Sequence, residues 1–96
     1  MDEFPQIFFR DGDLGRRAAL IGTRLDVWQV MDTVRNHDNS IDQAADYLNL
    51  PVQRVRAAVR YYAANRVEVD DFADRAISAA ERAESIWRAE QELLAS

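Results

Sequence analysis

The sequence predicts a mainly α-helical chain with a short N-terminal β-hairpin, three short helices and a separate C-terminal amphipathic helix. Two short apolar runs flank a glycine-containing turn near the N-terminus, and three segments between residues 26 and 66 repeat apolar residues at helical spacing. Residues 73–94 carry one long apolar face. At 96 residues the chain suits one small domain, but a chain this short is only marginally able to bury its own surface. Burial against a partner is therefore an open alternative at this point.

The predicted hairpin has its first strand at residues 6–10 and its returning strand at residues 18–21, joined by the turn-forming sequence DGDLG at residues 11–15. An isolated hairpin is unstable in water, so this one either packs on the helices or pairs with another chain. Phe8 and Phe9 are adjacent on one strand and point to opposite faces, which leaves one of them for a partner. The predicted dimerisation residues are Ile7, Phe8 and Phe9.

Three capping patterns mark the starts of the three short helices. Asp26 followed by Gln29, and Ser40 followed by Gln43, have the character of capping boxes. Pro51 suits the first turn of the third helix. The predicted buried faces consist of Val27, Val30, Met31 and Val34, then Ile41, Ala44, Ala45 and Leu48, then Val52, Val55, Val59 and Tyr62.

The second and third predicted helices have the spacing of a helix-turn-helix, because a short turn leads into a proline-started, arginine-rich helix. A helical wheel places Gln53, Ala57 and Tyr61 opposite the buried face. A small residue at this point lets a helix approach a major groove, where glutamine suits an adenine edge and arginine suits a guanine edge or a phosphate. The alternative is a solvent face decorated with arginine. The predicted DNA-binding residues are Gln53, Arg54, Arg56, Ala57, Arg60 and Arg24.

The net charge of −5 is distributed unevenly along the chain. Residues 1–15 carry four acids against one arginine, and residues 16–66 carry eight arginines against five aspartates. Residues 67–96 carry eight acids against three arginines. A basic middle and an acidic tail suggest contact with a polyanion and with a basic partner, respectively. The alternative is a solvated surface on which charge is segregated by chance.

The C-terminal helix is predicted to be set apart by a hinge, because residues 66–71 have little helical preference. Its apolar face, which includes Trp87, cannot easily be buried by the helix alone. Three outcomes are open at this point: the helix folds back on the domain, coils against a second copy, or docks in a partner's groove.

Enzymatic chemistry is poorly supported. There is no cysteine, and the single histidine, His37, lies in a polar loop without a serine placed for a triad. Asp38 and Asp42 do not have the spacing of a calcium loop, and neither Gly22 nor residues 12–15 match a phosphate-binding loop. We therefore expect no catalytic residue, no cofactor and no metal site. No run approaches the length of a membrane span and the N-terminus is acidic, so a cytoplasmic protein is expected.

The stretches GRRAALIGTRLDVWQVMDTV and SIDQAADYLNLPVQRVRAAVRYYA resemble the small bacterial and archaeal family catalogued as domain of unknown function 433, whose members are also described as VapB-type antitoxins. The family pattern has a hairpin ending in Gly-Thr-Arg, a Val-Trp helix start, a Tyr-x-x-Leu turn and a Val-Arg-Ala-Ala helix. These correspond here to residues 22–24, 27–28, 47–50 and 55–58. The resemblance covers residues 5–66, about two-thirds of the chain.

The resemblance implies a homeodomain-like helix-turn-helix fold and genetic pairing with a PIN-like ribonuclease toxin. Pro51 departs from the family pattern, which often has a serine or threonine cap there. The tail lies outside the matched region, but an acidic helix with embedded arginines complements a nuclease that holds RNA on a basic surface and metal ions on carboxylates. The predicted toxin-binding residues are Ile77, Ala80, Ala83, Ile86, Trp87, Leu94, Arg75, Arg82 and Arg88.

Two functions follow as expectations. The first is an antitoxin, a homodimer or part of a hetero-oligomer, whose residues 1–66 bind operator DNA and whose residues 67–96 sequester the toxin. The second is an adaptor or oligomerisation module without a DNA role, in which the same tail self-associates.

Overall fold

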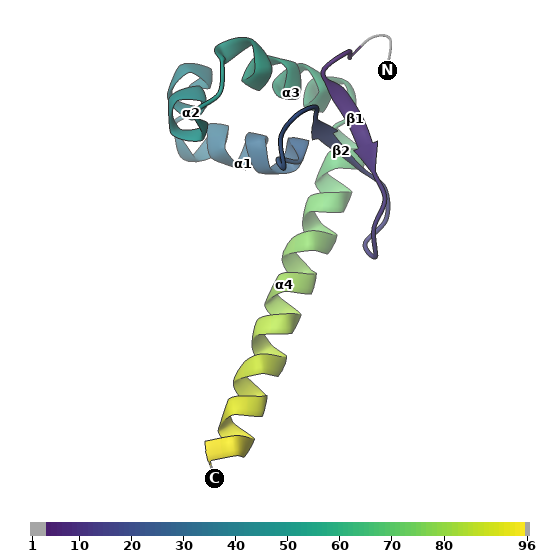
Figure 1. The fold of residues 1–96 in the computed structure, drawn as a ribbon, viewed down its shortest axis with the longest axis vertical. Coiled ribbons are helices and arrows are strands. Elements are labelled where there is room, and N and C mark those ends of the chain that lie inside the picture. The colour runs from purple at the N-terminus through teal and green to yellow at the C-terminus, as the bar shows by residue number, and fades with distance from the viewer. Residues whose placement is uncertain (1–3, 96) are drawn as a thin grey trace.

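Two strands and four helices make up residues 4–95, the part of the chain that this computed structural model describes (Figure 1). In chain order they are β1 (Ile7–Arg10), β2 (Arg17–Leu20), α1 (Val27–Asn36), α2 (Ile41–Leu48), α3 (Val52–Ala64) and α4 (Arg66–Ala95). The predicted mainly helical fold with an N-terminal hairpin is confirmed, and α1, α2 and α3 begin at the predicted positions.

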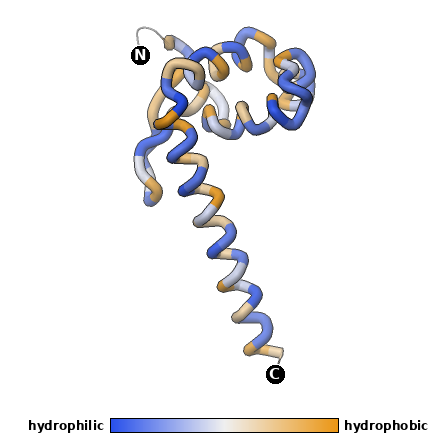
Figure 2. The backbone as a smooth tube through the Cα atoms, turned by 180° about the vertical axis from the view of Figure 1, so that it is seen from behind, coloured by the Kyte–Doolittle hydropathy of each residue, from blue (hydrophilic) through white to orange (hydrophobic). Residues whose placement is uncertain are grey.

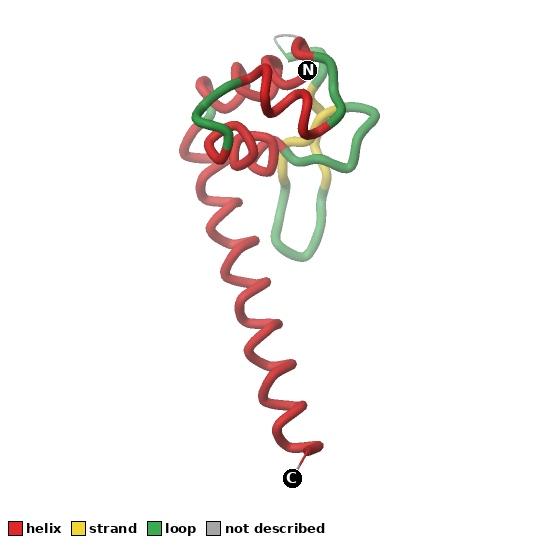
Figure 3. Tube along the Cα trace, turned by 90° about the vertical axis from the view of Figure 1, so that its left-hand side faces the viewer, coloured by secondary structure: helices red, strands yellow, loops and turns green. Residues whose placement is uncertain are grey.

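The molecule has two parts of different shape. Helices α1, α2 and α3 surround a common core, the hairpin covers one end of it, and α4 leaves this group as a long rod (Figures 1 and 3). The overall dimensions are 54 × 27 × 23 Å, and the long axis follows α4. Residues 4–77 are called the head below, and residues 78–95 of α4 are called the stalk.

The head is held together by the apolar faces that helical spacing predicts. All four predicted residues of α1 are buried, and Val55 of α3 and Leu20 of β2 are completely enclosed with them. At the start of α2 the Oγ atom of Ser40 accepts a hydrogen bond from the Gln43 amide at 3.1 Å. Such a cap is worth about 1 kcal/mol. Local capping and core burial therefore favour the same helix boundaries.

The turn between α2 and α3 consists of three residues. The first residue ends α2 and the last one begins α3. Asn49 adopts the left-handed conformation with φ 56°, which asparagine tolerates better than most residues. The amide of Leu50 reaches back to the Ala45 carbonyl at 2.9 Å, and Leu50 packs against the core. Pro51 is the N-cap of α3. This short connection fixes the angle at which α3 leaves α2.

The two strands pair antiparallel, with Ile7 opposite Leu20 and Arg10 opposite Arg17. The hairpin loop lies beside the first turns of α4 (Figure 3). The Nε atom of Arg75 in α4 donates to the Leu14 carbonyl of this loop at 3.1 Å. The hairpin is therefore packed on the helices of its own chain.

An ion pair between a half-buried arginine and a buried aspartate joins the hairpin to the start of α1. The Asp26 carboxylate, in a residue only 7% exposed, lies 2.9 Å from Nε of Arg17 and accepts a hydrogen bond from the Trp28 indole at 3.2 Å. The Gln29 side chain accepts from the Asp26 amide at 2.9 Å. Several residues that carry the family resemblance thus have a structural role in this chain.

The predicted hinge at residues 66–71 is wrong, because α4 begins at Arg66 and this whole segment is helical. Val69 and Phe72 are each only 5% exposed and pack on the head. Burying two large apolar side chains contributes several kcal/mol, which outweighs the weak helix propensity of valine and aspartate. The first three turns of α4 consequently belong to the head.

Two tyrosine hydroxyls fix the direction in which α4 leaves α3. The hydroxyl of Tyr61 donates to Glu68 at 2.7 Å, and that of Tyr62 donates to Asp70 at 3.0 Å. Tyr62 also accepts from Arg35 of α1 at 2.6 Å. Burial, followed by the hydrogen bond to Glu68 and its charge, raises the pKa of Tyr61, so this hydroxyl stays protonated and able to donate. The junction is therefore a fixed bend between two helices.

Candidate functional site

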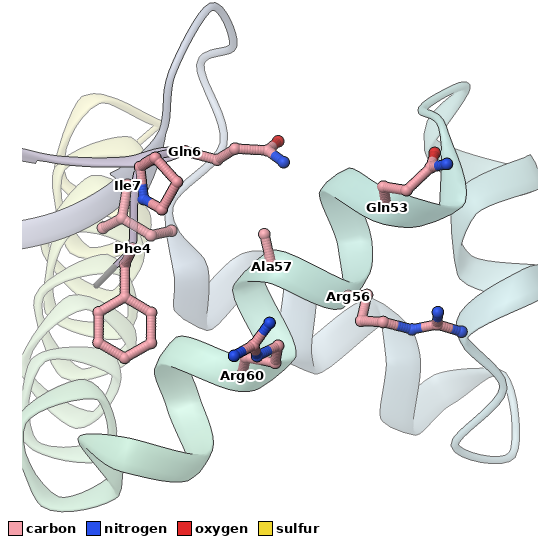
Figure 4. A pocket seen from close by; sticks show the side chains of 8 residues that line it. Phe4, Gln6, Ile7, Gln53, Arg56, Ala57 and Arg60 are labelled. Atoms are coloured by element: carbon pink, nitrogen blue, oxygen red, sulfur yellow. The ribbon is translucent and has the colours of Figure 1, made fainter. Parts of the chain in front are cut away.

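The outward side of α3 carries three exposed polar side chains, Gln53, Arg56 and Arg60, with the half-buried Ala57 between them. This helix side and the N-terminal segment 4–7 form the two walls of a groove of about 250 Å³ (Figure 4). Ala57 lies between the two walls and Arg56 points away from the N-terminal segment (Figure 4). Four of the six predicted DNA-binding residues are therefore brought together at one groove.

Arg54 occupies a different position from the other arginines of α3. It is half-buried, and its two terminal nitrogens lie 3.8 Å from where a Cβ atom would stand on Gly22. Gly22 has φ +76°, which favours glycine, and the guanidinium lies at ordinary van der Waals distance from this position. Arg24, two residues further along the same turn, is exposed. Arg54 and Arg24 thus lie at the turn that joins β2 to α1.

The predicted position of Tyr61 on the helical wheel is wrong. It was expected on the outward face with Gln53 and Ala57, but it is only 1% exposed. Its ring makes edge contacts with Phe4 and Phe9, at centroid distances of 5.1 and 6.2 Å. The wheel failed here because the N-terminal segment and the hairpin cover the C-terminal half of this face, a contact between residues more than 50 positions apart.

The three residues predicted for dimerisation are used mainly within the chain. Ile7 is 2% exposed in the core of the head, so its side chain is not available to a partner. Phe8 and Phe9 are partly exposed. Arg10 lies over the Phe8 ring at 5.0 Å, and Arg16 over the Phe9 ring at 3.8 Å. The hairpin face that carries Ile7 and Phe9 therefore packs on the helices of its own chain, whereas Phe8 lies on the other face of the hairpin.

The apolar residues predicted to bind a toxin lie on α4, and those on the stalk are open to solvent. Ile86, Trp87 and Leu94 are 56%, 59% and 72% exposed, while Ile77 at the edge of the head is 46% exposed. Ala80 and Ala83 are exposed on the same helix. Hydrophobic and hydrophilic residues alternate along the whole rod (Figure 2). The stalk therefore displays an apolar surface of the kind that marks an interaction site.

The three arginines predicted to face a toxin differ in their surroundings. Arg75 is bound to the hairpin loop through the Leu14 carbonyl and lies over the Phe72 ring at 5.5 Å. Arg88 forms an ion pair with Glu84 one turn earlier. Arg82 is exposed on the stalk. Arg75 is therefore engaged in the head, whereas Arg82 and Arg88 lie on the projecting part of the helix.

A second groove, of about 300 Å³, lies between α1 and α4 and was not expected from the sequence. Its walls combine apolar side chains, three aspartates and the basic Arg35. They include Trp28, Met31, Asp32, Asp70, Asp74 and Ile77. Helical spacing could not find this groove, because the two helices are about 40 residues apart and meet only when Val69 and Phe72 dock.

Within residues 4–95 there is no group of three or more histidine, cysteine, aspartate or glutamate side chains that could hold a metal ion. None of the helices described for this chain combines the length and the apolar character needed to cross a membrane. Comparison with protein-family models, curated proteins and solved structures finds no match to this chain.

Proposed function

We propose that this chain is an antitoxin of a type II toxin–antitoxin system and a member of the family of domain of unknown function 433. In this proposal the helices α2 and α3 act as a homeodomain-like helix-turn-helix on operator DNA. The helix α4 binds and neutralises a PIN-like ribonuclease. The observation that carries the proposal is the separation of two surfaces: exposed arginines on α3 of the head, and an exposed, acidic, amphipathic stalk.

The DNA role is supported by the chemistry around the groove at α3. Arg56 and Arg60 are exposed cations that suit phosphates, and Gln53 at the start of α3 suits a base edge. The turn between α2 and α3 is three residues long, a length typical of a helix-turn-helix, which supports α3 as the recognition helix. Arg54 and Arg24 extend the positive charge to the turn beside Gly22. Few phosphate contacts per chain mean that useful affinity requires two copies on one operator.

The toxin role is supported by the composition and exposure of the stalk. It carries four glutamates and two arginines besides its exposed apolar residues. Trp87 and Ile86 are large anchors of the type that dominate binding energy at interfaces. The glutamates complement an RNA-binding surface, and Arg82 or Arg88 suits a cluster of catalytic carboxylates.

The DNA role is tested by electrophoretic mobility shift with the promoter region upstream of the gene. We expect affinity to fall as salt rises, and Arg56→Ala to weaken binding by roughly tenfold or more. Arg88→Ala is the matched control, because it removes the same charge from the stalk and is expected to leave affinity nearly unchanged. Absence of a salt-dependent shift would favour an adaptor without a DNA role.

The toxin role is tested by co-expression with the product of the neighbouring gene. The full chain is expected to co-purify with that protein and to inhibit its ribonuclease activity, whereas a chain ending at Ser78 is expected to do neither. The cut is placed just beyond the head, so that Val69 and Phe72, which are part of its core, are kept. Neutralisation by the chain 1–78 would show that the stalk is not the toxin-binding element.

A further inference from the structure

The stalk continues an apolar stripe that begins in the core of the head. Starting from Val69, the stripe recurs at alternating intervals of four and three residues, which is the 3.5-residue repeat of a helix that packs along another helix. Its positions are Val69, Ala73, Ala76, Ala80, Ala83, Trp87, Glu90 and Leu94, and only Glu90 among them is charged. The head buries the first of these, and the members from Ala80 onward are exposed. This stripe, called the seam below, is therefore covered by the head at its N-terminal end and exposed to solvent at its C-terminal end.

Along this seam, small side chains come first and large side chains follow. Alanine occupies positions 76, 80 and 83, and the large residues Trp87 and Leu94 follow. Small residues leave notches that large ones fill when two helices approach closely. A helix with the same seam running in the opposite direction presents its large residues to the notches and its alanines to Trp87 and Leu94. The surface is therefore complementary to a reversed copy of itself.

We propose that the stalk pairs antiparallel with the stalk of a second copy of this chain, in the register that places Ala83 opposite Trp87 of the partner subunit. The same register sets Ala76 opposite Leu94 of the partner subunit, and Ala80 opposite Glu90 of the partner subunit. Each large apolar side chain then meets an alanine. The dyad axis crosses the paired helices at the level of residue 85.

A parallel pair does not fit the same seam. In register, it would bring the two Glu90 carboxylates face to face and would stack Trp87 on its own copy while leaving gaps between the alanines. In the antiparallel register the two Glu90 residues lie about 15 Å apart along the axis, at ~1.5 Å per residue. The two Glu90 charges are thereby separated and the side-chain volumes of the seam are matched, so both features favour the antiparallel direction.

The flanks of the seam agree with this register. On one side Ile86 meets its own copy near the dyad and Leu93 meets Ala79 of the partner subunit, which covers two residues that are 56% and 77% exposed in the single chain. On the other side the two Glu84 carboxylates lie near each other at the dyad, and each keeps its ion pair with Arg88 of its own helix, which offsets the repulsion between them. The pairing therefore covers the four large apolar residues of the stalk and leaves its outward glutamates in solvent.

This inference does not depend on the proposed function, although it uses the same face of α4. The second copy and a toxin cannot occupy one stalk simultaneously. In an antitoxin the stalk pair is therefore the state of the chain without toxin, and toxin binding separates it.

Sedimentation equilibrium of the purified chain tests the pairing. The chain is expected to be a dimer at micromolar concentration, and Ala83→Glu is expected to make it monomeric by placing a charge in the seam. Ala89→Glu is the matched control, since Ala89 lies on the opposite face of the same helix and its variant is expected to stay dimeric. Both positions are exposed, so circular dichroism should give the same helix content for both variants. A monomeric wild-type chain, or equal behaviour of the two variants, overturns the proposal.

Disulfide trapping tests the direction and register, because the chain contains no cysteine. Ala80→Cys and Glu90→Cys chains of different size, mixed and oxidised, are expected to form mixed disulfides in preference to disulfides between identical chains. Cysteines in identical chains would lie about 15 Å apart, far beyond the ~4 Å between Cβ atoms that a disulfide needs. Disulfides mainly between identical chains would show a parallel pair and overturn the register. A dimer that forms correctly in a chain that binds no toxin would remove the proposed function and keep this inference.

Discussion

The head and the stalk are built from similar residues, yet only the head buries them. Val69 and Trp87 lie on the same face of α4, but Val69 is 5% exposed and Trp87 is 59% exposed. The difference is that α1, α3 and the hairpin reach the first turns of α4 and end there (Figure 1). An apolar face on this helix therefore gives stability where the chain supplies a neighbour, and a binding surface where it does not.

Shortening α4 at two different positions is the sharpest test of this comparison. A chain ending at Ser78 is expected to keep the stability of the head within about 0.5 kcal/mol, because the stalk makes few contacts with it. A chain ending at Asn65 loses Val69 and Phe72 from the core, and large core deletions of this kind cost about 3–5 kcal/mol or more. Urea unfolding of both chains measures the difference. Equal stabilities would mean that the first turns of α4 do not belong to the head.

The same contrast is expected for one residue type at two places. Leu20 is 0% exposed in the core of the head and Leu94 is 72% exposed on the stalk. Leu20→Ala is expected to lower the free energy of unfolding by about 2–5 kcal/mol, and Leu94→Ala by less than about 0.5 kcal/mol at concentrations where the chain is monomeric. Thermal or urea unfolding of the two variants gives the comparison. A large effect of Leu94→Ala in the monomer would show that the stalk folds back in solution.

The two ion pairs offer a third contrast. Arg17 neutralises the buried Asp26, so Arg17→Gln leaves a desolvated carboxylate with weaker partners and is expected to cost roughly 1–3 kcal/mol. Arg88→Gln removes an exposed pair with Glu84 and is expected to cost at most about 0.5 kcal/mol. High salt should reduce the smaller effect further and leave the larger one nearly intact. Equal effects in the two variants would argue that the Asp26 site is hydrated.

The junction between α3 and α4 gives the mildest effect, and it depends on pH. The pKa of Tyr61 is raised above its usual value of 10.0, chiefly by burial and then by Glu68. The folded state therefore keeps this proton at a pH where the unfolded state has released it. The contribution of Tyr61 to stability is expected to be fully present and independent of pH below pH 10, and to fall above it by up to about 1.4 kcal/mol per pH unit. Tyr61→Phe should remove this slope, while the chain 1–78, which keeps Tyr61 and Glu68, should retain it. A slope that survives Tyr61→Phe would assign it to another group.

Much of the fold could be read from local patterns. The capping residues and the spacing of apolar residues gave the starts of α1, α2 and α3, because a helix depends mainly on residues within one or two turns of each other. The segment 66–71 was misread because the same local rule gives little weight to Val69, whose helical state depends on burial against the head. Tyr61 was misplaced for the same reason, since Phe4 and Phe9 cover it from distant positions.

The candidate sites divide in the same way. Gln53, Arg56 and Arg60 were predicted to share one side of α3, and they do so at the groove with the N-terminal segment. The placement of Arg54 against Gly22, the use of Arg75 by the hairpin loop and the acidic groove between α1 and α4 all involve residues 30 or more positions apart. Spacing within one helix carries no information about such contacts.

The sequence by itself determined where α1, α2 and α3 begin, where the hairpin turns, and that α4 carries an apolar seam in which alanines are followed by tryptophan and leucine. These properties depend on backbone preference and on period, and both are local. Only the tertiary structure decided how much of that seam is covered. The head closes over Val69 and Phe72 and ends before Ala80, because the bend fixed by Tyr61 and Tyr62 directs α4 away from the remaining helices.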